Sequence, residues 1–228
     1  MKHSKRFMAF VTVAAMSVSV LSFTAFAENV NHVMIWTSDG GTGTNGIVTI
    51  NNNINAATGT FNITWKTIKP PFNFIAGVGW STGKASRKIG YNFGIFNHTS
   101  GSTGCTYLDF YGWTRNSLIE YYVFDNWVNY VPNDGTKVGT LSTDGATYTY
   151  YYKNANGANI DGSGPFKQVI SIRDSGAKRT AGTITFQNHV NAWNSNANTK
   201  LGNSWCYQVM CIEGYNSSGS ANGSVWES

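Results

Sequence analysis

The feature that most constrains the fold is a repetition of short runs rich in Ile, Val, Thr, Tyr, Phe and Trp, separated by clusters of Gly, Asn and Ser. β-Branched and aromatic residues favour strands, whereas Gly, Asn and Ser favour the turns between them. The runs predicted as strands are 46–51, 60–66, 73–80, 88–96, 106–113, 117–124, 136–141, 146–153, 166–173, 182–185, 204–214 and 224–226.

One segment departs from this pattern. Phe186, Val190, Trp193 and Ala197 recur at helical spacing, which predicts a short helix over 186–196. No linker, repeat or change of composition marks a second domain. Many short strands with one helix predict an all-β fold, a jelly-roll sandwich of two twisted antiparallel sheets.

Composition excludes two other classes of protein. Only 12% of the residues are charged, and 14% are aromatic. A coiled coil would be rich in Ala, Glu, Lys and Leu, and a disordered chain would have few aromatic residues and a high net charge.

The first 27 residues have the pattern of a secretory signal peptide. Basic residues at 2, 5 and 6 precede an apolar run over 7–23, and Ala25-Phe26-Ala27 is a small-x-small cleavage pattern. A membrane anchor is disfavoured because the apolar run is short for a span and is interrupted by Thr and Ser. We expect a signal peptide at 1–27, a single domain at 28–228, and a secreted, extracellular protein that is free of the membrane after cleavage.

The basic charge of the chain belongs largely to this leader. Its three basic residues account for the fall in formal net charge from +5 to +2 when 1–27 is removed. The remaining Lys and Arg residues are scattered and form no run or stripe, so no nucleic-acid partner is predicted.

Cysteine and histidine are sparse. Cys105, Cys206 and Cys211 include no C-x-x-C pair, and the histidines after the leader are isolated, so no metal site is predicted. Cys206 and Cys211 lie five positions apart in one predicted strand, so we expect them to point to opposite faces and not to bridge. A bridge to Cys105 and three buried free thiols both remain open.

Glutamate is depleted from strands, so its positions are informative. After the leader it occurs only at 28, 120, 213 and 227. Glu28 and Glu227 lie beside the ends of the domain and are expected to be solvated. Glu120 and Glu213 lie inside the most aromatic predicted strands.

The period of two in a strand places these two glutamates on aromatic faces. The same alternation places Leu108 and Phe110 on the opposite, core face. The residues expected on the faces that carry the carboxylates are Tyr122 and Phe124 with Glu120; Trp205, Tyr207, Val209 and Tyr215 with Glu213; and Tyr111 and Trp113 on the strand 106–113.

A carboxylate among apolar rings must be paired or have a raised pKa. One interpretation is structural, with each Glu in a salt bridge, and Arg115 close to Glu120 in sequence fits it. The other is a pair of catalytic carboxyl groups, as in glycosidases. So few cations lie nearby that the catalytic interpretation is favoured.

Four motifs make the sequence closely similar to glycoside hydrolase family 11, the small endo-1,4-β-xylanases, in the expected order from Trp36 to Trp226. The motifs are Tyr107-Leu-x-x-Tyr-Gly-Trp-Thr-Arg115, Leu118-Ile-Glu-Tyr-Tyr-Val-x-Asp-x-Trp127, Asn188-His-Val-Asn-Ala-Trp193 and Trp205-x-Tyr-Gln-Val-Met-x-x-Glu-Gly-Tyr215. The resemblance implies a jelly roll with a cleft and a thumb hairpin, and a retaining double displacement on internal bonds of xylan. It also implies a xylan partner; no cofactor is needed, because two carboxyl groups suffice. Nothing in the sequence suggests more than a monomer.

The resemblance assigns roles residue by residue. Glu120 matches the nucleophile and Glu213 the acid/base, with carboxyl groups expected about 5–5.5 Å apart for retention. Asn73 matches a residue that hydrogen-bonds the acid/base, in the version associated with near-neutral pH optima. The other positions implied to bind substrate are Trp36, Tyr111, Trp113, Tyr122, Tyr130, Pro132, Ile160, Gln168 and Tyr207.

The thumb segment 153–162 departs from the family pattern. Ala158 stands at the usual Pro position and Asn154 at the usual Arg position, while Ile160 is kept. Without the φ restraint of Pro, and with Gly157 added, we expect a more mobile tip. We expect any effect of this departure to fall on affinity and cleavage pattern and not on the chemistry.

Two other functions share the composition. A non-catalytic carbohydrate-binding jelly roll would have an aromatic face but would not need two glutamates in facing strands. A jelly-roll glucanase would need both, and only the motif resemblance separates xylan from glucan.

Overall fold

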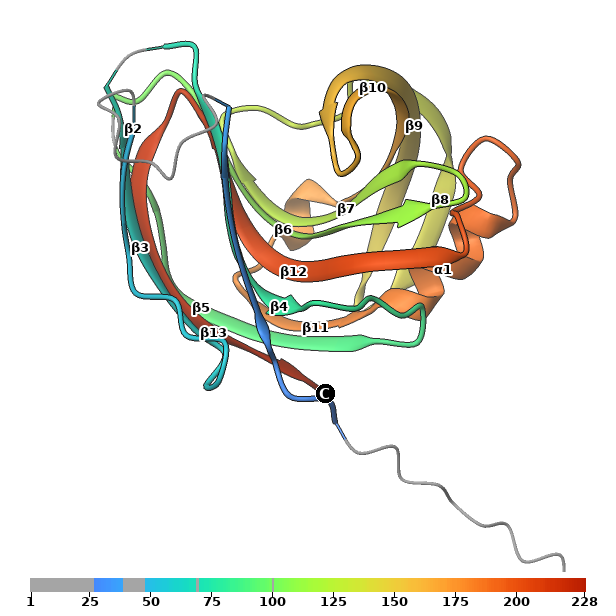
Figure 1. The fold of residues 1–228 in the computed structure, drawn as a ribbon, viewed down its shortest axis with the longest axis horizontal. Helices are drawn as coiled ribbons and strands as arrows, with labels where there is room; N and C mark the ends of the chain where they lie inside the picture. Colours follow the sequence, from blue (N-terminus) through green and yellow to red (C-terminus); the bar gives the residue numbers. More distant parts are fainter. Residues whose placement is uncertain (1–26, 39–47, 69, 100) are drawn as a thin grey trace, which may run out of the picture.

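The computed structural model describes residues 27–38, 48–68, 70–99 and 101–228. The predicted leader therefore lies outside the described residues, except for Ala27. The described parts form two β-sheets, one α-helix and a short 3₁₀ turn, η1 (Ser175–Ala177) (Figure 1).

The larger sheet, sheet A, curves strongly, and the end of the β9–β10 hairpin folds over its concave side (Figure 1). Its strands, in spatial order, are β1 (His32–Thr37), β4 (Asn73–Trp80), β12 (Ser204–Tyr215), β6 (Cys105–Arg115), β7 (Ile119–Val128), β10 (Gly162–Arg173), β9 (Ala146–Asn159) and β8 (Thr136–Thr143). Every pairing is antiparallel except β7 with β10, which a long connection through β8 and β9 joins in parallel.

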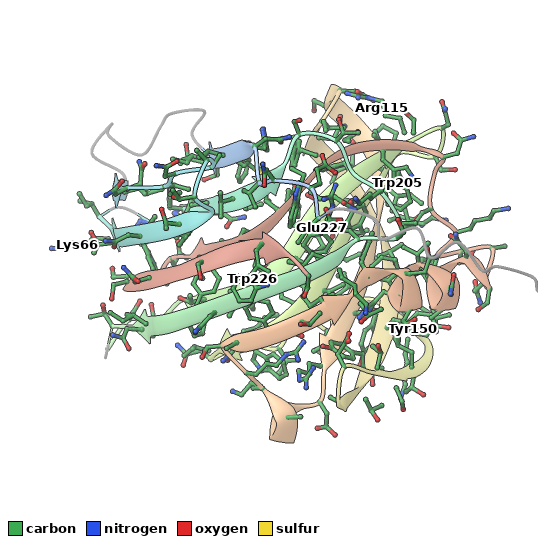
Figure 2. The ribbon with its side chains drawn as sticks, turned by 90° about the horizontal axis from the view of Figure 1, so that it is seen from below. Lys66, Arg115, Tyr150, Trp205, Trp226 and Glu227 are labelled. Carbon is green, nitrogen blue, oxygen red and sulfur yellow. The ribbon has the colours of Figure 1, made fainter. Side chains whose placement is uncertain are left out.

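The smaller sheet, sheet B, covers one face of sheet A. Its order is β11 (Ala181–Thr185), β5 (Lys88–His98), β13 (Ser218–Glu227), β3 (Thr60–Thr67) and β2 (Val48–Asn52). The predicted jelly-roll sandwich is confirmed. Side chains of both sheets fill the space between them (Figure 2).

Most predicted strands are present, and three differences are informative. β1 was not predicted. β9 and β10 extend beyond their predicted ends, through Asn- and Gly-rich sequence, and form a hairpin. The two strands stay paired along their length, and the last pair before the turn is Asn159 with Gly162. β13 begins six residues earlier than predicted, at Ser218. Small residues in this part of β13 let its neighbours β5 and β3 approach it closely. For example, a Cβ on Gly219 would lie 2.1 Å from the carbonyl oxygen of Asn97 on β5.

The helix α1 (Phe186–Asn194) is close to its predicted span. Phe186, Val190 and Trp193 are buried in the core between the sheets, as their spacing predicts. The indole N–H of Trp193 donates to Ser171 Oγ on β10 at 3.0 Å, so the helix is fixed to the base of the thumb strands.

Sheet A has two faces of different character. Its core face carries Leu108, Phe110 and Tyr121 toward sheet B. Its opposite face, here called the cleft face, carries a second apolar cluster that includes Tyr111 and Tyr122. The alternation predicted for β6 and β7 is therefore confirmed.

The same alternation fails near the start of β12. The register with β6 shifts between Trp205 and Gln208, as at a β-bulge. Trp205 consequently packs against Tyr121 and Phe186 in the core, and the prediction that it shares the face of Glu213 is wrong. Cys206 and Cys211, predicted on opposite faces, both join the cleft-face cluster. All three cysteines are buried free thiols.

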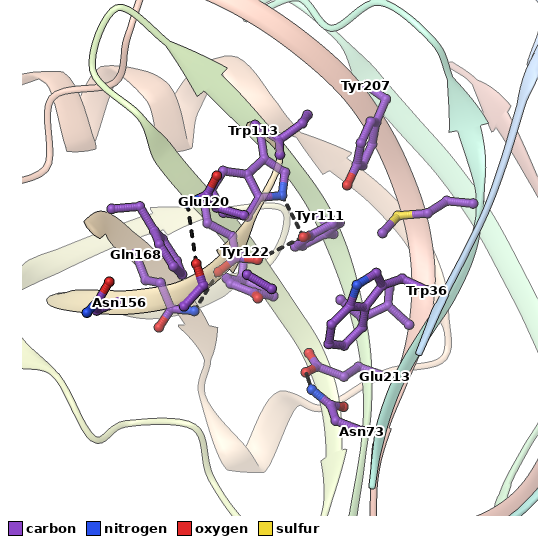
Figure 3. Close-up of a pocket in the computed structure, with 17 residues that line it drawn as sticks. Trp36, Asn73, Tyr111, Trp113, Glu120, Tyr122, Asn156, Gln168, Tyr207 and Glu213 are labelled. Atoms are coloured by element: carbon purple, nitrogen blue, oxygen red, sulfur yellow. Dashed lines mark hydrogen bonds between the residues drawn. The ribbon is translucent and has the colours of Figure 1, made fainter. Parts of the chain in front are cut away.

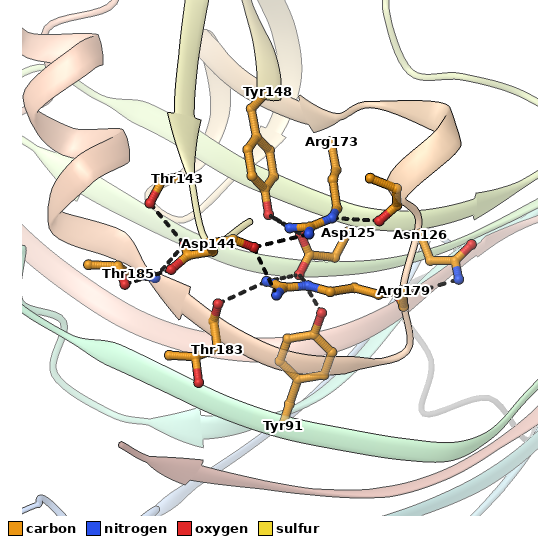
Figure 4. A network of polar contacts seen from close by, with 11 residues as sticks. Tyr91, Asp125, Asn126, Thr143, Asp144, Tyr148, Arg173, Arg179, Thr183 and Thr185 are labelled. Atoms are coloured by element: carbon orange, nitrogen blue, oxygen red, sulfur yellow. Dashed lines mark hydrogen bonds and ion pairs between the residues drawn. The ribbon is translucent and has the colours of Figure 1, made fainter. Parts of the chain in front are cut away.

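A buried ionic network joins the two sheets below the thumb (Figure 4). Asp125 on β7, fully buried, accepts hydrogen bonds from Tyr91 on β5, from Tyr148 Oη on β9 at 2.5 Å, and from Arg179 Nε at 2.8 Å. The guanidinium of Arg173 donates to Tyr148 Oη at 2.6 Å. These contacts fix β7, β9 and β10 against sheet B.

A second ionic cluster joins the ends of the domain and corrects one prediction. Glu227 is not solvated: its side chain is 8% exposed and lies 2.7 Å from Lys84 Nζ and 3.5 Å from Arg87 Nη1. Arg87 is fully buried, lies over the ring of Trp80 and also contacts Glu28, whose side chain is 40% exposed. The backbone N–H of Glu28 donates to Glu227.

Because Glu227 is a buried partner of Arg87, we predict that Glu227→Gln lowers the free energy of unfolding by about 3 kcal/mol, since it leaves the guanidinium undercompensated. Glu28→Gln removes a half-exposed partner and should cost below about 1 kcal/mol. Urea unfolding of the two variants measures both values, and equal effects would contradict the proposed importance of Glu227.

Candidate active site

A cleft runs over the cleft face of sheet A, under the thumb hairpin (Figure 3). Its inner part is a cavity of about 430 Å³ lined from β1, β4, β6, β7, β9, β10 and β12. A second cavity of about 760 Å³ adjoins it and shares Asn73, Tyr122, Gln168 and Glu213. The two cavities form one continuous cleft.

The structure brings the predicted site residues together in this cleft. The inner cavity is lined by Trp36, Asn73, Tyr111, Trp113, Glu120, Tyr122, Ile160, Gln168, Tyr207 and Glu213. Tyr130 and Pro132 line the second cavity, where Tyr130 is 52% exposed. The cleft also contains residues that sequence reasoning did not single out, among them Met34, Ile75, Asn156 and Phe166. Strand alternation gives the signal for Phe166, two positions before Gln168.

Glu120 is held rigidly in the floor of the cleft. The residue is 6% exposed, and its carboxylate accepts hydrogen bonds from Tyr111 Oη at 2.8 Å and from Gln168 Nε2 at 2.5 Å. The indole N–H of Trp113 donates to Tyr111 Oη at 2.6 Å, which orients that hydroxyl toward Glu120 (Figure 3).

The structural salt-bridge interpretation of Glu120 is not borne out. Arg115 pairs instead with Asp161 in the thumb turn, with 2.6 Å between Nε and Oδ1. Burial raises the pKa of Glu120, and hydrogen bonds from Gln168, Tyr111 and Tyr122 oppose that rise by stabilising the carboxylate. The carboxylate thus relies on neutral donors in place of an ion pair.

Glu213 enters the cleft from β12, where its surroundings differ. It remains partly accessible and accepts one hydrogen bond, from Asn73 Nδ2 at 3.2 Å. Desolvation, and then the negative charge of Glu120, raise the pKa of Glu213 to about 7. The two carboxyl groups in this cleft therefore differ in their surroundings. Several donors stabilise the carboxylate of Glu120, whereas one donor stabilises that of Glu213.

The thumb closes over this pair. β9 and β10 meet at a turn of Ile160 and Asp161, and Ile160 lines the inner cavity. Gly162 has φ +120°, a conformation that residues with a side chain rarely adopt. The greater mobility expected from Ala158 and Gly157 stays a prediction.

Within 27–38, 48–68, 70–99 and 101–228 no group of three or more His, Cys, Asp or Glu side chains could hold a metal ion. No helix among the described parts of the chain is long and apolar enough to cross a membrane.

A jelly-roll sandwich with two carboxyl groups among tyrosines and tryptophans in its cleft is the class of structure expected for a carbohydrate-cleaving enzyme. The family model of glycosyl hydrolases family 11 matches residues 29–224. The chain belongs to this family and is a glycoside hydrolase.

Similar proteins agree with this assignment. "Endo-1,4-beta-xylanase 3" of Pyricularia oryzae is 45% identical over 169 residues, which are 73% of this chain and 67% of the relative. "Endo-1,4-beta-xylanase 1" of Hypocrea jecorina is 43% identical over 72% of this chain and 67% of its own length. A solved structure described as one of two major endo-1,4-beta-xylanases from Trichoderma reesei superposes with a TM-score of 0.71, at 36% identity, over 86% of this chain and 98% of that one.

The donors to Glu120 generate a prediction. Gln168→Leu replaces the amide donor with an apolar side chain of similar size. The carboxylate of Glu120 then loses a hydrogen bond, so the pKa of Glu120 should rise further. Carboxyl ¹³C NMR titration measures the change. Gln187→Leu on the exposed side of α1 is the control and should leave the titration of Glu120 unaltered. An unchanged pKa of Glu120 in Gln168→Leu would show that the amide does not stabilise the carboxylate.

Proposed function

We propose that this enzyme is an endo-1,4-β-xylanase that hydrolyses internal bonds of xylan with retention, using Glu120 as the nucleophile and Glu213 as the acid/base. The observation that carries the proposal is the placement of two carboxyl groups in one cleft with different numbers of hydrogen-bond donors. Glu120 is buried with donors that favour its anion, and the pKa of Glu213 is raised to about 7. The names of the relatives support xylan as the substrate.

In the first step the Glu120 carboxylate attacks the anomeric carbon of the sugar on the non-reducing side of the scissile bond. The bond to the glycosidic oxygen breaks, and that oxygen takes the proton of Glu213. The products are an ester between Glu120 and the sugar, a released chain with a free hydroxyl, and an ionised Glu213.

In the second step Glu213 accepts a proton from a water molecule as the water oxygen attacks the same carbon. The ester bond breaks, Glu120 regains its negative charge and Glu213 regains its proton. Two inversions give net retention. The carboxyl separation of about 5–5.5 Å that this mechanism needs stays a prediction.

The remaining cleft residues fit the binding of a polysaccharide. Trp36, Trp113 and Tyr207 offer flat apolar surfaces with polar edges in the inner cavity, and Tyr130 offers one in the second. Asn73 and Gln168 add amide groups. A cleft with two connected parts suits a chain that is bound on both sides of the bond to be cleaved.

The alternative functions are separated by a direct assay. We expect reducing sugar to be released from xylan and little from carboxymethylcellulose. Binding of xylan without turnover would favour a carbohydrate-binding module, and faster turnover of the cellulose derivative would favour a glucanase.

We also propose that residues 1–27 are removed as a signal peptide and that the enzyme acts outside the cell as a monomer. The basic start, apolar run and Ala25-Phe26-Ala27 pattern support the first part. Mass spectrometry of protein from the culture medium, showing Glu28 at the N-terminus, is the test.

Substitution of Glu120 and of Glu213 should have different effects on turnover. Glu120→Gln should abolish turnover of xylan and of aryl xylosides, because no covalent intermediate forms. Glu213→Gln should lower kcat on xylan by roughly 10²–10⁴-fold, the usual contribution of a general acid. The same variant should still release a good phenolate leaving group, which needs no proton. Full activity of Glu120→Gln would overturn the assignment of the nucleophile.

The raised pKa of Glu213 fixes the alkaline side of the pH profile. The first step needs this carboxyl protonated, so kcat/KM on xylan should fall as pH rises through about 7. Because the charge of Glu120 contributes to the shift, Glu120→Gln should lower the pKa of Glu213, which NMR titration can follow. An unaltered pKa of Glu213 in that variant would show that the two groups are not coupled.

A further inference from the structure

A third carboxyl group lies buried beneath the floor of the cleft, on the strand between the two glutamates. Asp109 is on β6, which pairs with β12 on one side and with β7 on the other. Strand alternation places it on the cleft face, between Tyr107 and Tyr111. Its backbone is opposite Cys211 on β12 and Phe124 on β7.

Asp109 is fully buried and poorly satisfied. Its Oδ1 accepts a hydrogen bond from the Cys211 thiol at 3.1 Å. Its Oδ2 is buried and has no hydrogen-bond partner among the described residues. A buried ionised carboxylate with a free oxygen and no cation costs far more than the neutral acid.

The charged groups around Asp109 favour the same state. β12 contributes Glu213, and β7 contributes Glu120 and Asp125, so the charges that act on Asp109 are negative. The hydrogen bond from the Cys211 thiol opposes them, because it stabilises the carboxylate. Burial and these charges raise the pKa of Asp109 well above its ordinary value. In contrast, Asp125 on the core side pairs with Arg179.

A contact links Asp109 to the acid/base. The Cys211 thiol bonds Asp109 Oδ1 and approaches the backbone oxygen of Asp109 at 3.5 Å. Cys211 and Glu213 are two positions apart on β12, so they project from the same face. Asp109 therefore fixes the segment of β12 from which Glu213 enters the cleft.

We propose that Asp109 is a positioning residue of the active site, held as a neutral carboxylic acid between the strands of the two glutamates, where it orients Glu213 through Cys211 without adding a charge. The positioning role rests on the catalytic role proposed for Glu213. The neutral state of Asp109 does not depend on the role of Glu213.

A neutral Asp109 changes how the stability of the fold depends on pH, and this effect can be measured without any assay of activity. An Asp in the unfolded chain ionises near pH 3.9, whereas folded Asp109 keeps its proton to higher pH. Between those two values the folded state binds more protons, so stability falls as pH rises, by up to tenfold in the unfolding equilibrium constant per pH unit. Asp109→Asn has the same shape and no proton to lose.

The first experiment compares urea unfolding of the wild type and Asp109→Asn from pH 4 upward. The ratio of the wild-type to the variant unfolding constant should increase by about tenfold per pH unit until Asp109 ionises. Asp174→Asn, at an exposed position that precedes η1, is the matched control and should show no such trend. A ratio that is constant with pH would overturn the neutral state.

The second experiment tests positioning. Asp109→Ala removes the acceptor for Cys211, so kcat on xylan should fall by roughly tenfold to a hundredfold per folded molecule while KM is unchanged. Asp109→Asn restores the acceptor and should recover kcat, with the alkaline limb of the pH profile unmoved. Unchanged kcat in Asp109→Ala, or a limb that moves to lower pH in Asp109→Asn, would overturn the role.

A third measurement uses the unsubstituted residue. In Glu213→Gln the infrared band of a protonated carboxyl group should persist above the pH range in which an ordinary aspartic acid ionises, and adding Asp109→Asn should remove it. Absence of the band would contradict the neutral state. Full xylanase activity of Glu213→Gln would refute the proposed acid/base while leaving the unfolding result on Asp109 intact, so the two failures are distinguishable.

Discussion

The cost of placing carboxyl groups on an apolar sheet face is the constraint on which the rest of the site depends. The cleft face of sheet A is built from packed tyrosines, tryptophans and phenylalanines. A carboxylate placed there loses its hydration and must be stabilised by donors, or else keep its proton. Glu120 receives donors from Tyr111 and Gln168, and Glu213 receives one from Asn73. The number of neutral donors, more than any ion pair, distinguishes the two groups.

The two faces of sheet A treat acidic residues differently. On the core face Asp125 is neutralised by Arg179 and bonded by two tyrosines, and at the domain ends Arg87 neutralises Glu227. Those carboxylates are structural because their partners are fixed charges. Among the residues that the structure describes, no arginine pairs with Glu120 or Glu213 on the cleft face, and Arg115 bonds Asp161 instead. The pKa values of Glu120 and Glu213 can therefore respond to a charge that appears or disappears during a reaction.

Much of this arrangement follows from the sequence because the side-chain period of a strand is two. That rule placed Glu120, Tyr122 and Phe124 on one face without any structural knowledge, and it holds wherever β6 and β7 are regular. It failed at Trp205 and Cys206, because one shift of register reverses every face beyond it. A bulge of this kind depends on pairing with β6, which no local pattern reports. Glu227 was misjudged for a related reason: the partner that buries it, Arg87, is far away in sequence.

The thumb has an electrostatic as well as a steric effect on the pair. Lys153 lies on β9 opposite Gln168, whose amide bonds Glu120, and its positive charge lowers the pKa of both Glu120 and Glu213. Lys153 also pairs with Asp134 at 2.8 Å, which holds it near the second cavity. Since the hairpin that carries Lys153 also carries Ile160 at its tip, any motion of the whole hairpin would move a charge together with a residue that lines the cleft. The pKa values of the two glutamates and the shape of the cleft are therefore linked through one element. The Ala158 and Asn154 substitutions lie farther along the hairpin than Lys153, so they alter the tip without removing that charge.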